Sequence, residues 1–292
     1  MSSIKRFDLS DAFLFSYLYQ LETNLNQSSS LLDIKFQSEE SNTDEYLKNF
    51  FKNYIKNNNQ LDRINYQTLV FNYLNEKCEF KSIEILNCKI LNVFKPDELS
   101  SQLKFQLKSN KIGVYTNPDL LLEIAVSNNR VFKSIELKST KKDEIPGSSV
   151  QQVSPFEWVI FLKRDKGKIQ ISTGLYIDSI NNKLPFPDRS PRPKISFSNL
   201  KNHNKFNRVS KNNIMTFSSD SDSLREKIGL ISDWRESLIN EWLETVLNKS
   251  KLKNEKWFNN VIRRYSYQFI EKYESLTVEE KKILLKKLKE IS

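Results

Sequence analysis

Apolar and aromatic residues recur at helical spacing through much of the first quarter of the chain. The spacing predicts helices over Leu9–Asn26, Thr43–Asn57 and Asp62–Glu79, because side chains three and four residues apart share one face of a helix. Polar stretches at Gln27–Ser30 and at a later run of three asparagines interrupt it and predict a linker and a loop. We therefore expect residues 1–80 to form a helical N-terminal region.

The pattern changes in residues 81–180, where short apolar and β-branched runs are bounded by Asn, Lys, Gly and Pro. This is typical of strands, and the runs are KIGVY, DLLLEIAV, VFKSIEL, EWVIFL and IQISTGLYI. Asn128-Asn129 can adopt the positive φ angles of a tight turn, so the second and third runs are predicted to form a hairpin. Pro146–Ser149 supplies a break and a candidate helix cap before VQQVSPF. The expected order is strand, strand, helix, strand, strand, in an α/β fold.

The last third divides into an irregular and a regular part. Residues 181–213 carry four prolines and several basic side chains with little periodicity, which predicts a long loop, and we assign residues 181–220 to a basic loop region that is a candidate for DNA recognition. Residues 221–292 show helical spacing with charged outer faces. A helical C-terminal region is expected there.

Charge points to a polyanionic partner. Lys and Arg total 46 against 36 Asp and Glu, a formal net charge of +10. Such an excess attracts nucleic acid, although biased base composition in the source genome would also enrich a protein in lysine. DNA is the first partner to test.

Several classes of protein are disfavoured by composition. The two cysteines, Cys78 and Cys88, form no CxxC pair, and the single His203 cannot supply an imidazole cluster, so neither a disulfide framework nor a zinc site is expected. No signal-peptide pattern and no apolar run of membrane-spanning length occurs. We expect a reducing, cytoplasmic setting and no membrane partner.

One segment, NPDLLLEIAVSNNRVFKSIELKST, combines acids and a lysine in a pattern with a chemical use. Strand side chains alternate between faces, so Glu136 and Lys138 project to the same side, and the predicted hairpin brings Asp119 alongside. Two carboxylates held close together make a hard oxygen site for Mg²⁺. A bound Mg²⁺ polarises a phosphate and lowers the pKa of its water, as phosphodiester hydrolysis requires. A surface hairpin with unrelated charges is the alternative.

Pro118-Asp119, a spacer of 16 residues and then Glu136-Leu137-Lys138 resemble the PD-(D/E)xK nuclease superfamily, which includes most type II restriction endonucleases. The resemblance covers residues 111–177 and implies an α/β core with a mixed sheet, flanked here by N-terminal and C-terminal helices. It implies that Asp119 and Glu136 bind Mg²⁺ together with the main-chain carbonyl of Leu137, and that Lys138 is the catalytic lysine. The pairs Pro96-Asp97 and Pro187-Asp188 lack a suitably placed acid and lysine.

Further residues are candidates for DNA contacts. Serines, glutamines and basic side chains near the motif and in the loop region suit phosphates and base edges, and the candidates are Lys141, Lys142, Ser148, Ser149, Gln151, Gln152, Arg189 and Arg192. Ordinary helix capping by the serines and simple solvation of the lysines are the competing interpretations.

The sequence thus predicts a sequence-specific, Mg²⁺-dependent endonuclease that cuts double-stranded DNA, as the restriction enzymes of restriction-modification systems do. A homodimer is expected because cutting both strands usually needs two active sites. Three alternatives remain: a repair or junction nuclease of the same superfamily, a noncatalytic DNA-binding protein, and an RNA-processing nuclease.

Overall fold

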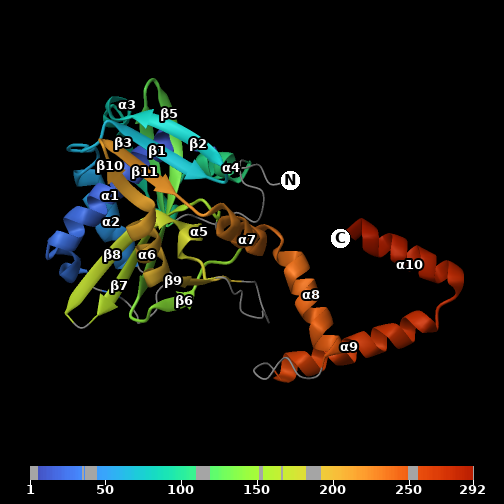
Figure 1. The fold of residues 1–292 in the computed structure, drawn as a ribbon. Coiled ribbons are helices and arrows are strands. Elements are labelled where there is room, and N and C mark those ends of the chain that lie inside the picture. Colours follow the sequence, from blue (N-terminus) through green and yellow to red (C-terminus); the bar gives the residue numbers. More distant parts are fainter. Residues whose placement is uncertain are drawn as a thin grey trace. The chain divides into compact units, whose positions relative to one another are not determined.

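The computed structural model describes residues 6–34, 36, 45–109, 119–150, 154–165, 167–181, 192–248 and 256–291. The chain forms two compact units: Met1–Pro185 with Ser190–Ser232, and Phe186–Arg189 with Asp233–Ser292. Strands and helices are mixed in the first unit, and the described part of the second unit is helical (Figure 1).

A five-stranded mixed sheet forms the centre of the first unit. Its order is β3 (Lys89–Phe94), β4 (Leu120–Val126), β5 (Asn129–Thr140), β7 (Trp158–Asp165) and β8 (Lys168–Leu175). Strands β5 and β7 run parallel, and the other neighbours are antiparallel. The sheet and its flanking helices confirm the coarse prediction of an α/β fold with a mixed sheet.

Helix α1 (Leu9–Gln27) lies between this sheet and a second one. The second sheet has the order β10 (Arg208–Lys211), β11 (Ile214–Ser218), β1 (Thr68–Tyr73) and β2 (Glu76–Lys81). Trp158 of β7 donates to Asp11 of α1 at 3.2 Å, while the ring of Phe15 packs on rings of the second sheet. Residues Ser10–Leu18 are buried on every side of the helix, as expected for a helix covered on both faces.

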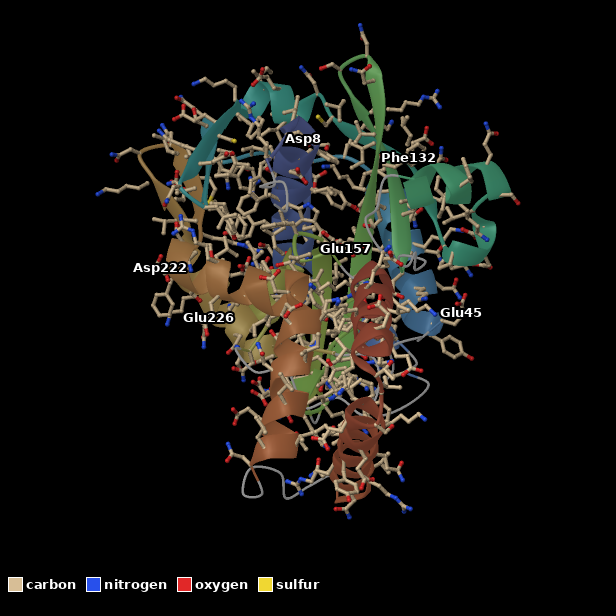
Figure 2. All side chains as sticks on the ribbon, turned by 90° about the vertical axis from the view of Figure 1, so that its right-hand side faces the viewer. Asp8, Glu45, Phe132, Glu157, Asp222 and Glu226 are labelled. Atoms are coloured by element: carbon tan, nitrogen blue, oxygen red, sulfur yellow. The ribbon has the colours of Figure 1, made fainter. Side chains whose placement is uncertain are left out.

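The remaining elements cover these sheets or connect them. In the first unit they are η1 (Ser30–Asp33), α2 (Glu45–Asn57), α3 (Ser82–Leu86), η2 (Pro96–Glu98), α4 (Ser101–Ser109), β6 (Glu144–Pro146), α5 (Tyr176–Ser179), β9 (Lys194–Ser196), α6 (Phe197–Asn207) and α7 (Ser221–Ser232). Helix α7 turns its acidic side chains Asp222 and Glu226 to solvent (Figure 2).

The second unit contains α8 (Trp234–Leu247), α9 (Lys256–Glu274) and α10 (Val278–Ile291). Arg263 of α9 donates to the carbonyl of Thr245 in α8 at 2.8 Å, which ties these two helices together. The helical C-terminal region is therefore as predicted over its described residues. No helix in the described ranges combines the length and the apolar character needed to cross a bilayer.

A buried polar network connects the second sheet to α5 and α6. Tyr73 of β1 donates to Asp178 of α5 at 3.0 Å, and His203 of α6 lies 3.4 Å from the other oxygen of Asp178. Burial raises the pKa of Asp178 and lowers the pKa of His203. The fold thus favours the neutral form of each group.

Three predictions about local structure were wrong. Asp62–Glu79 contains β1 and most of β2 instead of a helix, with Leu74 and Asn75 at positive φ in the turn. Between β5 and β7, the described residues hold the short strand β6 and turns, and no helix; Gln151 and Gln152 lie outside the described residues. Residues 194–211 form β9, α6 and β10 instead of a loop.

The predicted hairpin of DLLLEIAV and VFKSIEL is confirmed as β4 and β5. Its turn lies one residue earlier than expected: Ser127 has the positive φ, and Asn129 already pairs with Val126. The runs EWVIFL and IQISTGLYI correspond to β7 and β8, and KIGVY lies outside the described residues.

Candidate active site

The β4–β5 hairpin brings Asp119 next to the end of β5. Leu120 pairs with Ile135, so the same register continued by one residue sets Asp119 opposite Glu136. The backbone N–H of Leu137 donates to Asp119 Oδ2 at 2.9 Å. Asp119 is 7% exposed, which makes it a buried acid held by a main-chain donor.

Glu136 and Lys138 form an ion pair on one face of β5. Lys138 Nζ lies 2.6 Å from Glu136 Oε1, and Lys138 is only 1% exposed. The two residues are two positions apart on a strand and therefore share a face, as the sequence predicted. Burying an ammonium is unfavourable without a partner, and Glu136 supplies that partner.

Ser148, which follows β6, completes the environment of Glu136. Its hydroxyl donates to Glu136 Oε1 at 2.5 Å, and its backbone N–H donates to the Tyr176 hydroxyl at 2.8 Å. Gly147 allows this approach, because a Cβ at that position would collide with the Tyr176 hydroxyl. The predicted Ser148 therefore contacts Glu136, and the structure adds Tyr176, which the sequence reasoning missed.

Lys48 is the second residue that the sequence reasoning missed. It projects from α2, and its Nζ lies 2.9 Å from Asp119 Oδ1, with side-chain exposures of 14% for Lys48 and 10% for Asp119. Each of the two acids thus has its own lysine. Only the tertiary packing of α2 brings Lys48 here, so no local sequence signal marked it.

Asp119 and Glu136, the acid pair of the site, repel each other when both are ionised. Burial raises the pKa of Asp119, and the neighbouring Glu136 raises it further, while Lys138 and Lys48 act in the opposite direction. Burial also raises the pKa of Tyr176, and Glu136 adds to that effect. A cation placed between the two carboxylates would relieve their repulsion.

The donor set fits Mg²⁺ in its chemistry. Asp119 and Glu136 offer carboxylate oxygens, which are the ligands a hard divalent cation prefers, and water and phosphate usually complete its shell. Leu137 turns its N–H toward Asp119, and a strand residue presents its carbonyl at the same edge as its N–H. Within the described ranges, no three or more His, Cys, Asp or Glu side chains gather as a metal site. Any ion here would therefore depend on water and substrate for its remaining ligands.

The other predicted DNA-binding residues are placed in different ways. Lys141 and Lys142 are exposed directly after β5, and Arg192 is exposed before β9. Ser149 is buried, with 2% exposure, and faces the protein interior. Gln151, Gln152 and Arg189 lie outside the described residues.

Comparison with models of known protein families, with curated protein sequences and with solved structures found no match. The function therefore has to be inferred from the geometry of the site alone. The residues concerned are Asp119, Glu136, Lys138, Lys48 and Ser148.

Proposed function

We propose that the protein is a Mg²⁺-dependent endonuclease that hydrolyses phosphodiester bonds in double-stranded DNA at specific sequences, in the manner of type II restriction endonucleases. The observation that carries the proposal is the gathering of two carboxylates and a fully buried lysine at the open end of the β4–β5 hairpin. A buried ion pair is seldom more stable than well-packed apolar residues of the same volume. Such a costly cluster with a perturbed acid therefore favours a functional role over a structural one.

Each residue has a distinct task in this proposal. Asp119 and Glu136 would hold Mg²⁺, which supplies a polarised phosphate and a water of lowered pKa. Lys138 would orient the attacking water and balance negative charge on the phosphate. Glu136 holds the ammonium of Lys138, and Ser148 fixes Glu136.

The test is a digest of unmethylated phage DNA with Mg²⁺, comparing wild type with Asp119→Asn and Glu123→Gln. Glu123 is a matched control because it is also a buried acid on β4, where it bonds to Asn92 and Arg130. Discrete bands from wild type and Glu123→Gln, with intact DNA from Asp119→Asn, would support the proposal. Intact DNA in every lane, with binding that is indifferent to Mg²⁺, would support the noncatalytic alternative.

Two other outcomes separate the remaining alternatives. A smear in place of bands would indicate a nuclease without sequence specificity, and cleavage restricted to branched DNA or to RNA would indicate a junction or RNA-processing enzyme. Light scattering on the purified protein tests the proposed homodimer, which should show twice the chain mass of 34.5 kDa. A monomer at working concentration would contradict it.

A further inference from the structure

Helix α2 carries a row of three lysines at a spacing of four residues. We call them the α2 lysine row: Lys48, Lys52 and Lys56. This spacing sets successive members on one side of the helix, about 6 Å apart along its axis. The adjacent stripe of the helix is buried and consists of Leu47, Phe51 and Ile55. Because the buried stripe holds α2 in place against the protein, it also fixes the side of the helix on which the lysine row lies.

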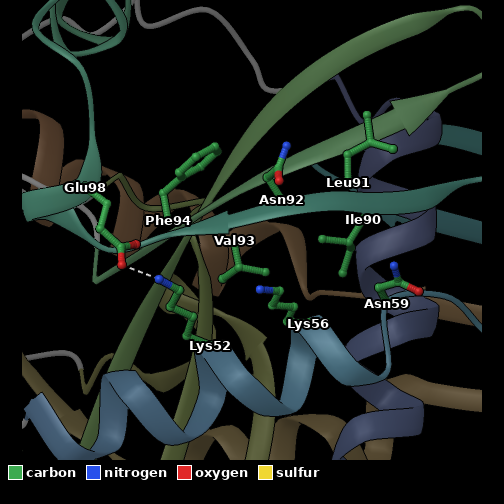
Figure 3. Close-up of a pocket in the computed structure, with 9 residues that line it drawn as sticks. All are labelled: Lys52, Lys56, Asn59, Ile90, Leu91, Asn92, Val93, Phe94 and Glu98. Carbon is green, nitrogen blue, oxygen red and sulfur yellow. Dashed lines mark hydrogen bonds and ion pairs between the residues drawn. The ribbon is translucent and has the colours of Figure 1, made fainter.

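The row connects the candidate active site with a pocket. At one end, the ammonium of Lys48 contacts Asp119. Toward the other end lies a pocket of about 310 Å³ between α2 and β3, lined by Lys52, Lys56, Asn59, Ile90, Leu91, Asn92, Val93, Phe94 and Glu98. Figure 3 shows Lys52 and Lys56 rising from α2 beneath Val93, with Ile90 also turned toward the helix.

The charges of Lys52 and Lys56 are available to a ligand. Lys56 is exposed, and no acidic side chain pairs with it in the part of the chain that the structure describes. Lys52 pairs with Glu98, and both side chains are partly exposed. An ion pair of this kind is weak, so a phosphate can replace Glu98 at little cost.

A row of evenly spaced cations suits a polyanion with regularly repeated charges better than it suits one small anion. We propose that Lys52 and Lys56 of the α2 lysine row bind successive backbone phosphates of the DNA strand that enters the Asp119–Glu136 site, with the pocket beside β3 receiving the nucleotide at the far end. The inference rests on the proposed function for the identity of the strand. It assigns α2 a role in positioning that strand.

The test is the salt dependence of DNA binding, measured by fluorescence anisotropy with a labelled duplex in the presence of a chelator, so that no cleavage occurs. Each phosphate contact contributes about 0.9 to the slope of log affinity against log salt. Lys52→Gln/Lys56→Gln should therefore reduce the slope by about 1.8, so a fourfold rise in salt costs the variant about 12-fold less affinity than it costs wild type. Lys52→Arg/Lys56→Arg should keep the wild-type slope.

The matched control is Lys77→Gln/Lys211→Gln, which removes two exposed lysines from the second sheet. It should change the slope by less than half as much. Glu98→Gln should strengthen binding, because it releases Lys52 from its acidic partner. Equal slopes for the Lys52/Lys56 variant and the control would overturn the proposal.

The readout also separates this inference from the proposed function. Cleavage by wild type with Mg²⁺, together with an unchanged slope in the Lys52→Gln/Lys56→Gln variant, would keep the nuclease and remove the row. A reduced slope without any cleavage by wild type would keep the row as a DNA-binding surface and remove the nuclease.

Discussion

Asp119→Asn should abolish cleavage and at the same time stabilise the fold at neutral pH. The substitution keeps the shape of the side chain and an oxygen that accepts from the N–H of Leu137, and it removes only the charge. A residue kept for stability would behave in the opposite way. The variant therefore separates a functional acid from a structural one.

The expected sign follows from the pKa of Asp119. Burial and then Glu136 raise this pKa above 3.8, so the folded state holds the proton more tightly than the unfolded state does. The stabilising contribution of the protonated acid is complete below about 3.8 and is lost as the pH rises through the folded pKa. A tenfold difference in proton affinity between the folded and unfolded states corresponds to about 1.4 kcal/mol of stability.

Asparagine cannot ionise, so the variant does not incur this loss. We expect its advantage over wild type to grow with pH and to reach about 1 kcal/mol at neutral pH, the usual size of a single stabilising change. For a folded unit of this size, that corresponds to a rise in Tm of about 2–4 °C. Cleavage should fall by at least about 100-fold, because losing even an indirect partner of a metal ligand costs about 10- to 100-fold and Asp119 is a proposed ligand itself.

The assay is thermal unfolding of wild type and Asp119→Asn in chelator across the acidic and neutral pH range, followed by the DNA digest on the same samples. Taking the difference between the two proteins cancels the titration of all other groups that the substitution leaves unchanged. A difference that stays flat with pH, or that turns against the variant as pH rises, would refute the reasoning. It would mean that the ion pair with Lys48 and the nearby charge of Lys138 balance or outweigh burial and repulsion.

Three further predictions concern neighbouring groups. Lys138→Met should eliminate cleavage and lower the free energy of unfolding by about 3 kcal/mol, measured in urea, because it leaves Glu136 without its ion-pair partner. Ser148→Ala should slow cleavage by about 10- to 100-fold while changing stability by less than about 1.5 kcal/mol, and an unchanged rate would show that the Glu136 contact has no role in positioning. Because burial lowers the pKa of His203, the wild-type protein should lose stability as pH falls below about 6.5, and His203→Gln should weaken that dependence in thermal melts.

The sequence predicted the central hairpin because two apolar and β-branched runs, now β4 and β5, lie on either side of a short polar turn. The helix expected over Asp62–Glu79 was wrong, because the local sequence does not distinguish helix from strand there. Its apolar residues are close enough together to satisfy both helical and strand spacing, and the turn at Leu74-Asn75 contains neither glycine nor proline. Pairing of β1 with β2, and with β11, which lies far away in sequence, distinguishes the two structures.

The candidate site was also predicted only in part from the sequence. Asp119, Glu136 and Lys138 lie on one hairpin, so strand geometry and turn position were sufficient to predict their proximity. Lys48 reaches Asp119 from α2, and Tyr176 reaches Ser148 from α5, through packing between elements that no local pattern encodes. Sequence reasoning therefore identified the acids and Lys138 on the hairpin, and it missed Lys48 and Tyr176, which reach the site from other elements.

Within the proposed function, Lys48 contributes to the charge balance of the site. With both acids ionised, Asp119 and Glu136 carry two negative charges, and Lys48 and Lys138 carry two positive charges, so the four groups sum to zero. A site that is neutral before substrate arrives would be doubly positive with a divalent cation held by Asp119 and Glu136. That charge matches the two negative charges that a phosphodiester carries when hydroxide adds to it, and stabilising developing charge is where most catalytic power arises. Replacing Lys48 by a neutral residue would remove half of that match, so its contribution should appear in the rate of cleavage more than in the binding of uncut DNA.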